Sequence, residues 1–125
     1  ALEKYVTYHG IVGGEEKRNL LKLCDIFALP TRYPNEGQPI SILEAMGNGM
    51  FIITTDHAGI PDIVEDGVNG VILGSEMDLR RLYKNIFSLQ FQEYKKVIVN
   101  NRKSCKILYT ENSYVQKIYQ IYNIL

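Results

Sequence analysis

The chain has 125 residues, which is enough for one domain with a hydrophobic core and short for two. Hydrophobic residues make up 46% and charged residues 22%, a composition that excludes a disordered or fibrous protein. Fourteen basic and fourteen acidic residues give a net charge of zero, which excludes attraction of nucleic acid by the field of the whole molecule. Any polyanionic ligand must therefore be held by local contacts.

The two cysteines, Cys24 and Cys105, do not have the spacing of metal ligands, so we expect free thiols in a cytoplasmic protein. No apolar run approaches the roughly 20 residues of a membrane span, and no signal peptide opens the chain. We therefore expect a soluble protein. A start at Ala1 without Met indicates that a segment upstream has been removed.

Four short runs have the composition of β-strands: residues 4–10, 25–30, 50–55 and 67–74. The third run is apolar throughout and β-branched, as expected for a strand buried on both faces of a parallel sheet. The segments between them predict helices over residues 15–24, 40–46 and 75–89, the last with a capping box at Ser75 and Asp78, and a short turn over 60–66. This alternation predicts an α/β fold with a Rossmann-like, mostly parallel sheet of about four strands and flanking helices.

Residues 91–125 predict two terminal helices that complete a single domain with the alternating part, residues 1–90. Each helix has an apolar stripe that needs a surface to cover. The stripes consist of Tyr94, Val97, Ile98, Asn101, Cys105 and Leu108, and of Tyr114, Ile118, Ile121, Tyr122 and Leu125. Basic residues lie mostly off the first stripe and form either a solvated face or a patch for acidic lipid or a partner; they are Lys95, Lys96, Arg102, Lys103 and Lys106.

The loop after the second strand leads into a helix that we expect to begin at about Ile40, with Pro39 at the first helical position. Such a start leaves the N–H groups of Ile40, Ser41 and Ile42 without partners at the edge of the sheet where ligands bind. This helix start is therefore a candidate binding site for a phosphate group.

Two glutamates, Glu36 and Glu44, flank this candidate phosphate site. A carboxylate can accept hydrogen bonds from two neighbouring hydroxyls, so the pair suits a ligand with a central diphosphate and a polyol at each end, such as a nucleotide sugar. From spacing alone two simpler interpretations stay open. Glu44 could only complement the helix dipole, and Glu36 could be a solvated loop residue.

The segment from Asp25 to Leu73 resembles the C-terminal domain of the family 4 retaining glycosyltransferases, which belong to the glycosyl transferases group 1 and have the two-domain GT-B fold. The resemblance rests on consecutive blocks: a strand ending in Pro, the E-x7-E motif with Leu-Glu-Ala-Met, a Gly-Ile-Pro-acid turn and an Asp-Gly-x-Asn-Gly turn. The first run and the terminal helices also resemble this domain. The resemblance implies transfer of a sugar, with retention of configuration, from a nucleotide-diphosphate donor in polysaccharide or glycolipid biosynthesis, without a metal or other cofactor.

The resemblance also implies the site residues. Glu36 would be catalytic, contacting the donor sugar near the reacting carbon, and Glu44 would bind the ribose diol. The turn and helix start would hold the sugar and diphosphate, and the first run would contact the nucleobase. These positions are Gly37, Gln38, Pro39, Ile40, Ser41 and Ile42, followed by His9, Gly10 and Ile11.

The sequence differs from the family pattern at several positions. Gln38 and Pro39 replace the usual Phe-Gly, which removes one backbone N–H, and Ala58-Gly59 replaces Gly-Gly. His57 is either a solvated loop residue or a ligand contact. The strands that carry the family's diphosphate-binding Arg and Lys, and the N-terminal acceptor domain, are missing, so we expect half of a donor site and no activity from the chain alone.

In the family's strand order, the run 25–30 loses its inner neighbour and exposes an apolar edge. Either residues 4–10 take that place, or two chains form a homodimer through their edges. The full-length enzyme could also associate weakly with membranes. An alternative function is a non-enzymatic, flavodoxin-like binding or regulatory module that docks through its basic and Tyr-rich terminal helices.

Overall fold

The computed structural model describes residues 3–74, 79–88 and 91–122. These residues form three strands and five helices. In chain order they are α1 (Gly14–Leu23), β1 (Ile26–Leu29), α2 (Ile40–Asn48), β2 (Phe51–Thr55), β3 (Gly70–Leu73), α3 (Leu79–Ser88), α4 (Phe91–Leu108) and α5 (Glu111–Tyr122). The predicted α/β class is confirmed.

The sheet is parallel, with the order β1-β2-β3. Ile26 of β1 pairs with Phe51 of β2, and Ile52 of β2 pairs with Gly70 of β3. All five residues of the central strand β2 are buried, as its uninterrupted apolar run predicts. Among the described residues the sheet has three strands rather than about four.

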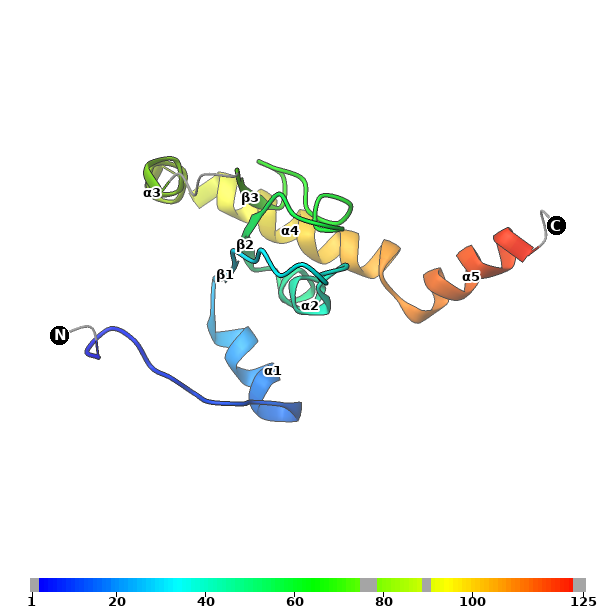
Figure 1. The fold of residues 1–125 in the computed structure, drawn as a ribbon, viewed down its shortest axis with the longest axis horizontal. Coiled ribbons are helices and arrows are strands. Elements are labelled where there is room, and N and C mark those ends of the chain that lie inside the picture. The colour runs from blue at the N-terminus through cyan, green and yellow to red at the C-terminus, as the bar shows by residue number, and fades with distance from the viewer. Residues whose placement is uncertain (1–2, 75–78, 89–90, 123–125) are drawn as a thin grey trace.

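The missing strand is the predicted one at residues 4–10, and that prediction is wrong. Residues 3–5 form a turn and residues 6–10 have no regular structure, with Tyr5 and Tyr8 exposed. Figure 1 shows this run as an extended trace that leads into α1, apart from the sheet. A strand needs a partner, and no described residue pairs with the outer edge of β1. The alternative in which this run inserts beside β1 is therefore also wrong, whereas the other alternative, a homodimer through the edge, stays a prediction.

The core has one cluster on each face of the sheet. Ile52 packs with Ile42 and Met46 of α2 on one face. Phe51 and Ile53 pack with Val97 of α4, and with side chains of α3, on the other face. Helix α4 also reaches α2 through Cys105, so it closes the core at the side. Helices thus cover both faces of the sheet, as in a doubly wound fold.

The two predicted terminal helices are confirmed, but their stripes differ in burial. In α4 Val97 and Asn101 are buried, whereas Leu108 is 46% exposed. Helix α5 has no buried residue, and Figure 1 shows it extending away from the sheet beyond the end of α4. The predicted stripe of α5 therefore covers no surface here. The predicted capping residues Ser75 and Asp78, and Leu125, lie outside the described residues.

Both cysteines are free, as expected. Cys24 is exposed at the end of α1, and Cys105 donates a hydrogen bond from Sγ to the carbonyl oxygen of Leu43. Burial raises the pKa of the Cys105 thiol. Within the described ranges, no helix combines the length and apolar character needed to cross a membrane.

Candidate functional site

The carboxyl ends of the three parallel strands lie at one edge of the sheet, and the loop after β1 is tied to the other two strands there. Thr55 at the end of β2 donates a hydrogen bond from Oγ1 to the carbonyl oxygen of Thr31. Arg32 donates from its guanidinium to the carbonyl oxygen of Gly74, just past β3, at 2.7 Å. The loop that carries Glu36 therefore has a defined position over this edge.

His57 holds the middle of the same loop. Its Nε2 lies 2.7 Å from the carbonyl oxygen of Tyr33. Because a carbonyl oxygen can only accept, Nε2 is the protonated nitrogen in this contact. The N–H of Glu36 donates to the same carbonyl oxygen at 3.1 Å, which forms a turn and leaves the glutamate half-buried. His57 thus positions the turn that carries Glu36, a role that sequence reasoning did not identify.

The loop after β2 packs closely against the residues that follow Glu36. The N–H of Gly59 donates to the carbonyl oxygen of Gly37 at 3.2 Å. A Cβ at position 59 would lie 3.0 Å from this oxygen and 3.0 Å from Cγ of Gln38, so only glycine fits without displacement. Next to it, Ala58 has a φ of +50°, in the left-handed region that favours glycine.

Helix α2 begins at Ile40, as predicted, but with a different arrangement of its first N–H groups. Pro39 lies one position earlier than expected, at the N-cap, and its carbonyl oxygen accepts from the N–H of Ile42 at 3.0 Å. The expectation that Ile42 has a free N–H is therefore wrong. The backbone hydrogen bonds of the described residues include none from the N–H of Ile40 or Ser41, so two donors remain at the helix start.

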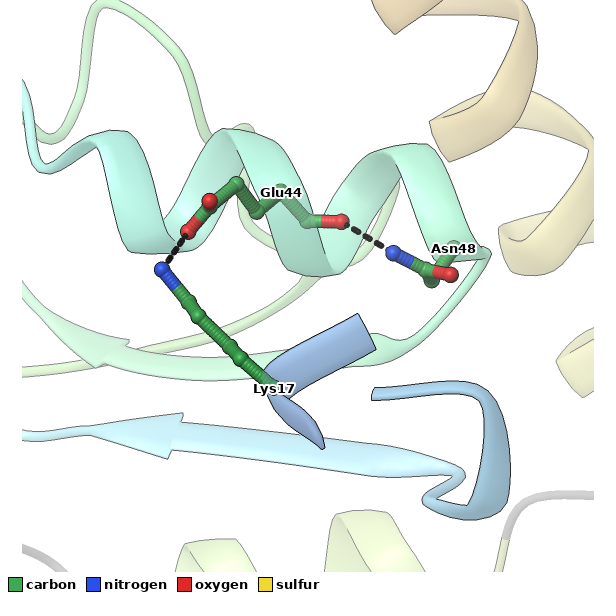
Figure 2. A network of polar contacts seen from close by, with 3 residues as sticks. All are labelled: Lys17, Glu44 and Asn48. Carbon is green, nitrogen blue, oxygen red and sulfur yellow. Dashed lines mark hydrogen bonds and ion pairs between the residues drawn. The ribbon is translucent and has the colours of Figure 1, made fainter. Parts of the chain in front are cut away.

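Glu44 lies one turn further along α2, and both its carboxylate and its backbone carbonyl oxygen have partners. Its carboxylate Oε2 lies 2.5 Å from the ammonium Nζ of Lys17 in α1. Its backbone carbonyl oxygen accepts a hydrogen bond from Nδ2 of Asn48 at 2.8 Å, and Figure 2 shows both contacts. The carbonyl oxygen of Asn48 in turn accepts from Arg102 of α4. The last turn of α2 is thus fixed to α4, and Arg102 is not part of a freely solvated face.

The structure does not bring every predicted site residue together. His9, Gly10 and Ile11 are exposed, and no hydrogen bond or ion pair within the described residues joins them to Glu36 or Glu44. The predicted contact of these residues with a nucleobase stays a prediction. The turn at 37–39, the helix start and the two glutamates do lie along one continuous segment at the carboxyl edge of the sheet.

A cavity of about 530 Å³ opens at the other edge, where β2 and β3 begin at Phe51 and Gly70. Charged side chains of Asp66, Glu93 and Lys96 line part of its wall. None of its lining residues belongs to the predicted donor site. The start of α2 is thus not part of this cavity.

The described residues contain no group of three or more His, Cys, Asp or Glu side chains arranged to hold a metal ion. Two tyrosines have a raised pKa, Tyr94 in α4 and Tyr109 just after its end. Burial, the negative charge of Asp25 and a hydrogen bond to it raise the pKa of Tyr94, although nearby Arg102 lowers it. Burial also raises the pKa of Tyr109. Neither tyrosine belongs to the predicted donor site.

Comparisons with known proteins match most of the chain. The family glycosyl transferases group 1 matches residues 1–90. The amylovoran biosynthesis glycosyltransferase AmsK of Erwinia amylovora is 34% identical over 73 residues, 55% of this chain and 18% of AmsK. The putative colanic acid biosynthesis glycosyltransferase WcaL of Escherichia coli K12 is 33% identical over 89 residues, 68% of this chain and 22% of WcaL.

The fold is also found in a solved structure. Anabaena HepE in complex with UDP and glucose superposes with a TM-score of 0.81 at 22% identity, over 99% of this chain and 33% of that chain. At this identity the likeness shows the fold alone. The chain thus spans between 18% and 33% of these three proteins. The family match over residues 1–90 shows that the chain belongs to the glycosyl transferases group 1.

Proposed function

We propose that this chain is the donor-binding part of a retaining glycosyltransferase that moves a sugar from a nucleotide-diphosphate sugar to an acceptor. The two curated relatives described above are named for the biosynthesis of bacterial polysaccharides, amylovoran and colanic acid. We therefore place the reaction in polysaccharide or glycolipid biosynthesis, and we further propose that the enzyme is cytoplasmic. HepE was solved with UDP and glucose, which supports a nucleotide sugar as the donor.

The observation that carries this proposal is the start of α2. The N–H groups of Ile40 and Ser41 have no acceptor among the backbone groups that the structure describes, and they lie at the positive end of the helix dipole. This start has no side-chain cap. An anion is the natural acceptor for two such donors at the carboxyl edge of a parallel sheet.

In this proposal the two glutamates bind different parts of the ligand. Glu44 accepts hydrogen bonds from the ribose diol, while Glu36 contacts the hydroxyls of the donor sugar beside the carbon that reacts. Gly37, Gln38 and Pro39 form the turn between the sugar and the distal phosphate. Because Pro39 has no N–H and its carbonyl oxygen is used by Ile42, the donors to the phosphate are those of Ile40 and Ser41.

The acceptor and the remaining diphosphate contacts come from outside the chain in this proposal. The relatives are several times longer than the segment they share with this chain. The chain therefore supplies half of the donor site, and we expect it to bind nucleotide sugars weakly and to transfer nothing alone.

The test removes one N–H without disturbing the fold. Proline is compatible with position 40, because proline suits the first helical position and Pro39 already has the extended ψ of 114° that a following proline requires. Ile40 is 72% exposed, so little packing is lost. Ile40→Ala removes the same side chain but keeps the N–H, and it serves as the matched control.

Binding of UDP-glucose, GDP-mannose and ADP-glucose is measured by ligand-observed NMR. We expect one donor to bind, and Ile40→Pro to weaken it about tenfold relative to Ile40→Ala, the worth of one hydrogen bond to a charged group. Glu44→Ala should weaken the same donor about as much, whereas Glu111→Ala on α5 should not. Equal binding by the two Ile40 variants, or no binding of any donor, would contradict the proposal.

A further inference from the structure

Glu44, the residue proposed to hold the ribose diol, is not a free carboxylate. The ammonium of Lys17 lies 2.5 Å from its Oε2. This oxygen is shielded from solvent, and the ammonium is its one short polar contact within the described part of the chain. The side chain of Glu44 as a whole is still 38% exposed, and its exposed part does not include Oε2.

Lys17 reaches Glu44 from a different element. It lies in the first turns of α1, where its N–H donates to the carbonyl oxygen of Gly13. Helix α1 has no buried residue and contacts the core through the half-buried Leu21. Figure 2 shows the Lys17 side chain extending from α1 to only one of the two carboxylate oxygens of Glu44.

We propose that Lys17 is a positioning residue of the donor site, which holds Glu44 by Oε2 and presents the remaining acceptor positions to the diol. This inference rests on the proposed function. An ionised carboxylate has about four acceptor positions, so the ammonium leaves enough for two hydroxyl groups. A glutamate that is already ordered loses less side-chain entropy when the ligand binds, and this increases affinity.

The ion pair joins two half-exposed side chains, with Lys17 40% and Glu44 38% exposed, and such pairs contribute little to folding. Replacement of Lys17 should therefore leave the fold intact. Lys22 lies in the last turn of the same helix and is exposed, so Lys22→Gln removes an equal charge as the matched control. Lys17→Arg keeps the charge and can still reach the carboxylate.

The full 125-residue chain and its variants are titrated calorimetrically with UDP and with 2′,3′-dideoxy-UDP, which has the diphosphate but no diol. Lys17→Gln should weaken the binding of UDP about three- to tenfold, which corresponds to the free energy of ordering one flexible side chain. The affinity for the dideoxy ligand should not change. Lys17→Arg should restore UDP binding, and Lys22→Gln should have no effect. Combined with Glu44→Ala, Lys17→Gln should cause no additional loss, because its effect passes through Glu44.

Three results would overturn this role of Lys17. An equal loss for both ligands would mean that Lys17 acts on the diphosphate. Tighter UDP binding by Lys17→Gln would mean that the lysine competes with the diol, and an unchanged affinity would mean that the pair is only a surface contact. Failure of the proposed function looks different, because wild type would then bind none of UDP, GDP and ADP, or Glu44→Ala would bind the nucleotide normally. Either outcome would also overturn the inference on Lys17.

Discussion

Asn101 of α4 joins the helix to the sheet, and its removal should be costly. The side chain is fully buried, and its Nδ2 donates to the carbonyl oxygens of Met50 at 2.7 Å and of Asn69 at 3.0 Å. Its Oδ1 accepts from Nδ2 of Asn69 at 2.7 Å. Both hydrogen-bonding atoms of the amide are thus used within the protein. The substitution Asn101→Ala removes all three contacts at once.

The loss can be worked out group by group. Two buried groups lose their partner, the carbonyl oxygen of Met50 and the Nδ2 of Asn69, at about 1–3 kcal/mol each. The carbonyl oxygen of Asn69 still accepts a hydrogen bond from the N–H of Ile52 at 3.2 Å, so its lost contact with Asn101 costs little free energy. Alanine regains roughly 0.5 kcal/mol through its higher helix propensity. We therefore expect the free energy of unfolding to fall by about 1.5–5.5 kcal/mol.

Urea unfolding followed by circular dichroism measures this change, provided that the m-value stays constant. Asn100→Ala is the matched control, because Asn100 is exposed on the same helix and should change stability by no more than about 0.5 kcal/mol. Asn101→Asp should lose at least as much as Asn101→Ala, since a carboxylate cannot donate to the two carbonyl oxygens. If Asn101→Ala and Asn100→Ala have equal stability, the reasoning is refuted.

Three further changes test local features of the fold. Gly49→Ala should lower the free energy of unfolding by about 2 kcal/mol, because φ is +83° and a Cβ would lie 2.7 Å from Nε of Arg102; a neutral result in urea unfolding would contradict this. Ala58→Gly should raise it by about 1 kcal/mol by relieving the left-handed φ, and a loss of stability would speak against strain there. The raised pKa of Tyr94 means that the folded protein retains its proton above pH 10, where the unfolded chain loses it. Stability should therefore fall as pH rises from about 10, and fall less steeply in Tyr94→Phe; identical alkaline slopes would exclude this contribution.

The elements that the sequence predicts well are those whose signals are local. Each of residues 51–55 is apolar or β-branched, and together they form the buried central strand. Pro39 indicates a helix start, and α2 begins at the next residue. Residues 4–10 have the composition of a strand but form none, because strand formation depends on a partner that composition does not reveal. The apolar stripe of α5 likewise predicts a helix but not the surface that it covers.

The site is predictable only in part for the same reason. The helix start and the two glutamates can be found from one continuous segment of sequence. Their assignment to sugar and ribose comes from the family resemblance, since spacing alone leaves simpler interpretations open. The pairing of Lys17 with Glu44 joins α1 to α2, which β1 separates in sequence, and no local pattern indicates it. The same holds for the contact between His57 and the turn before Glu36.

The central claim is that a nucleoside diphosphate binds at the start of α2, and amide chemical shifts test it most directly. The ¹⁵N-labelled chain is titrated with UDP, GDP and ADP in turn, and the shift of every backbone N–H is followed. We expect the largest changes at Ile40 and Ser41, with smaller ones in the loop at residues 31–38. Changes confined to the cavity at the other edge, at Gly67, Val71 and Lys96, or no changes at all, would contradict the account.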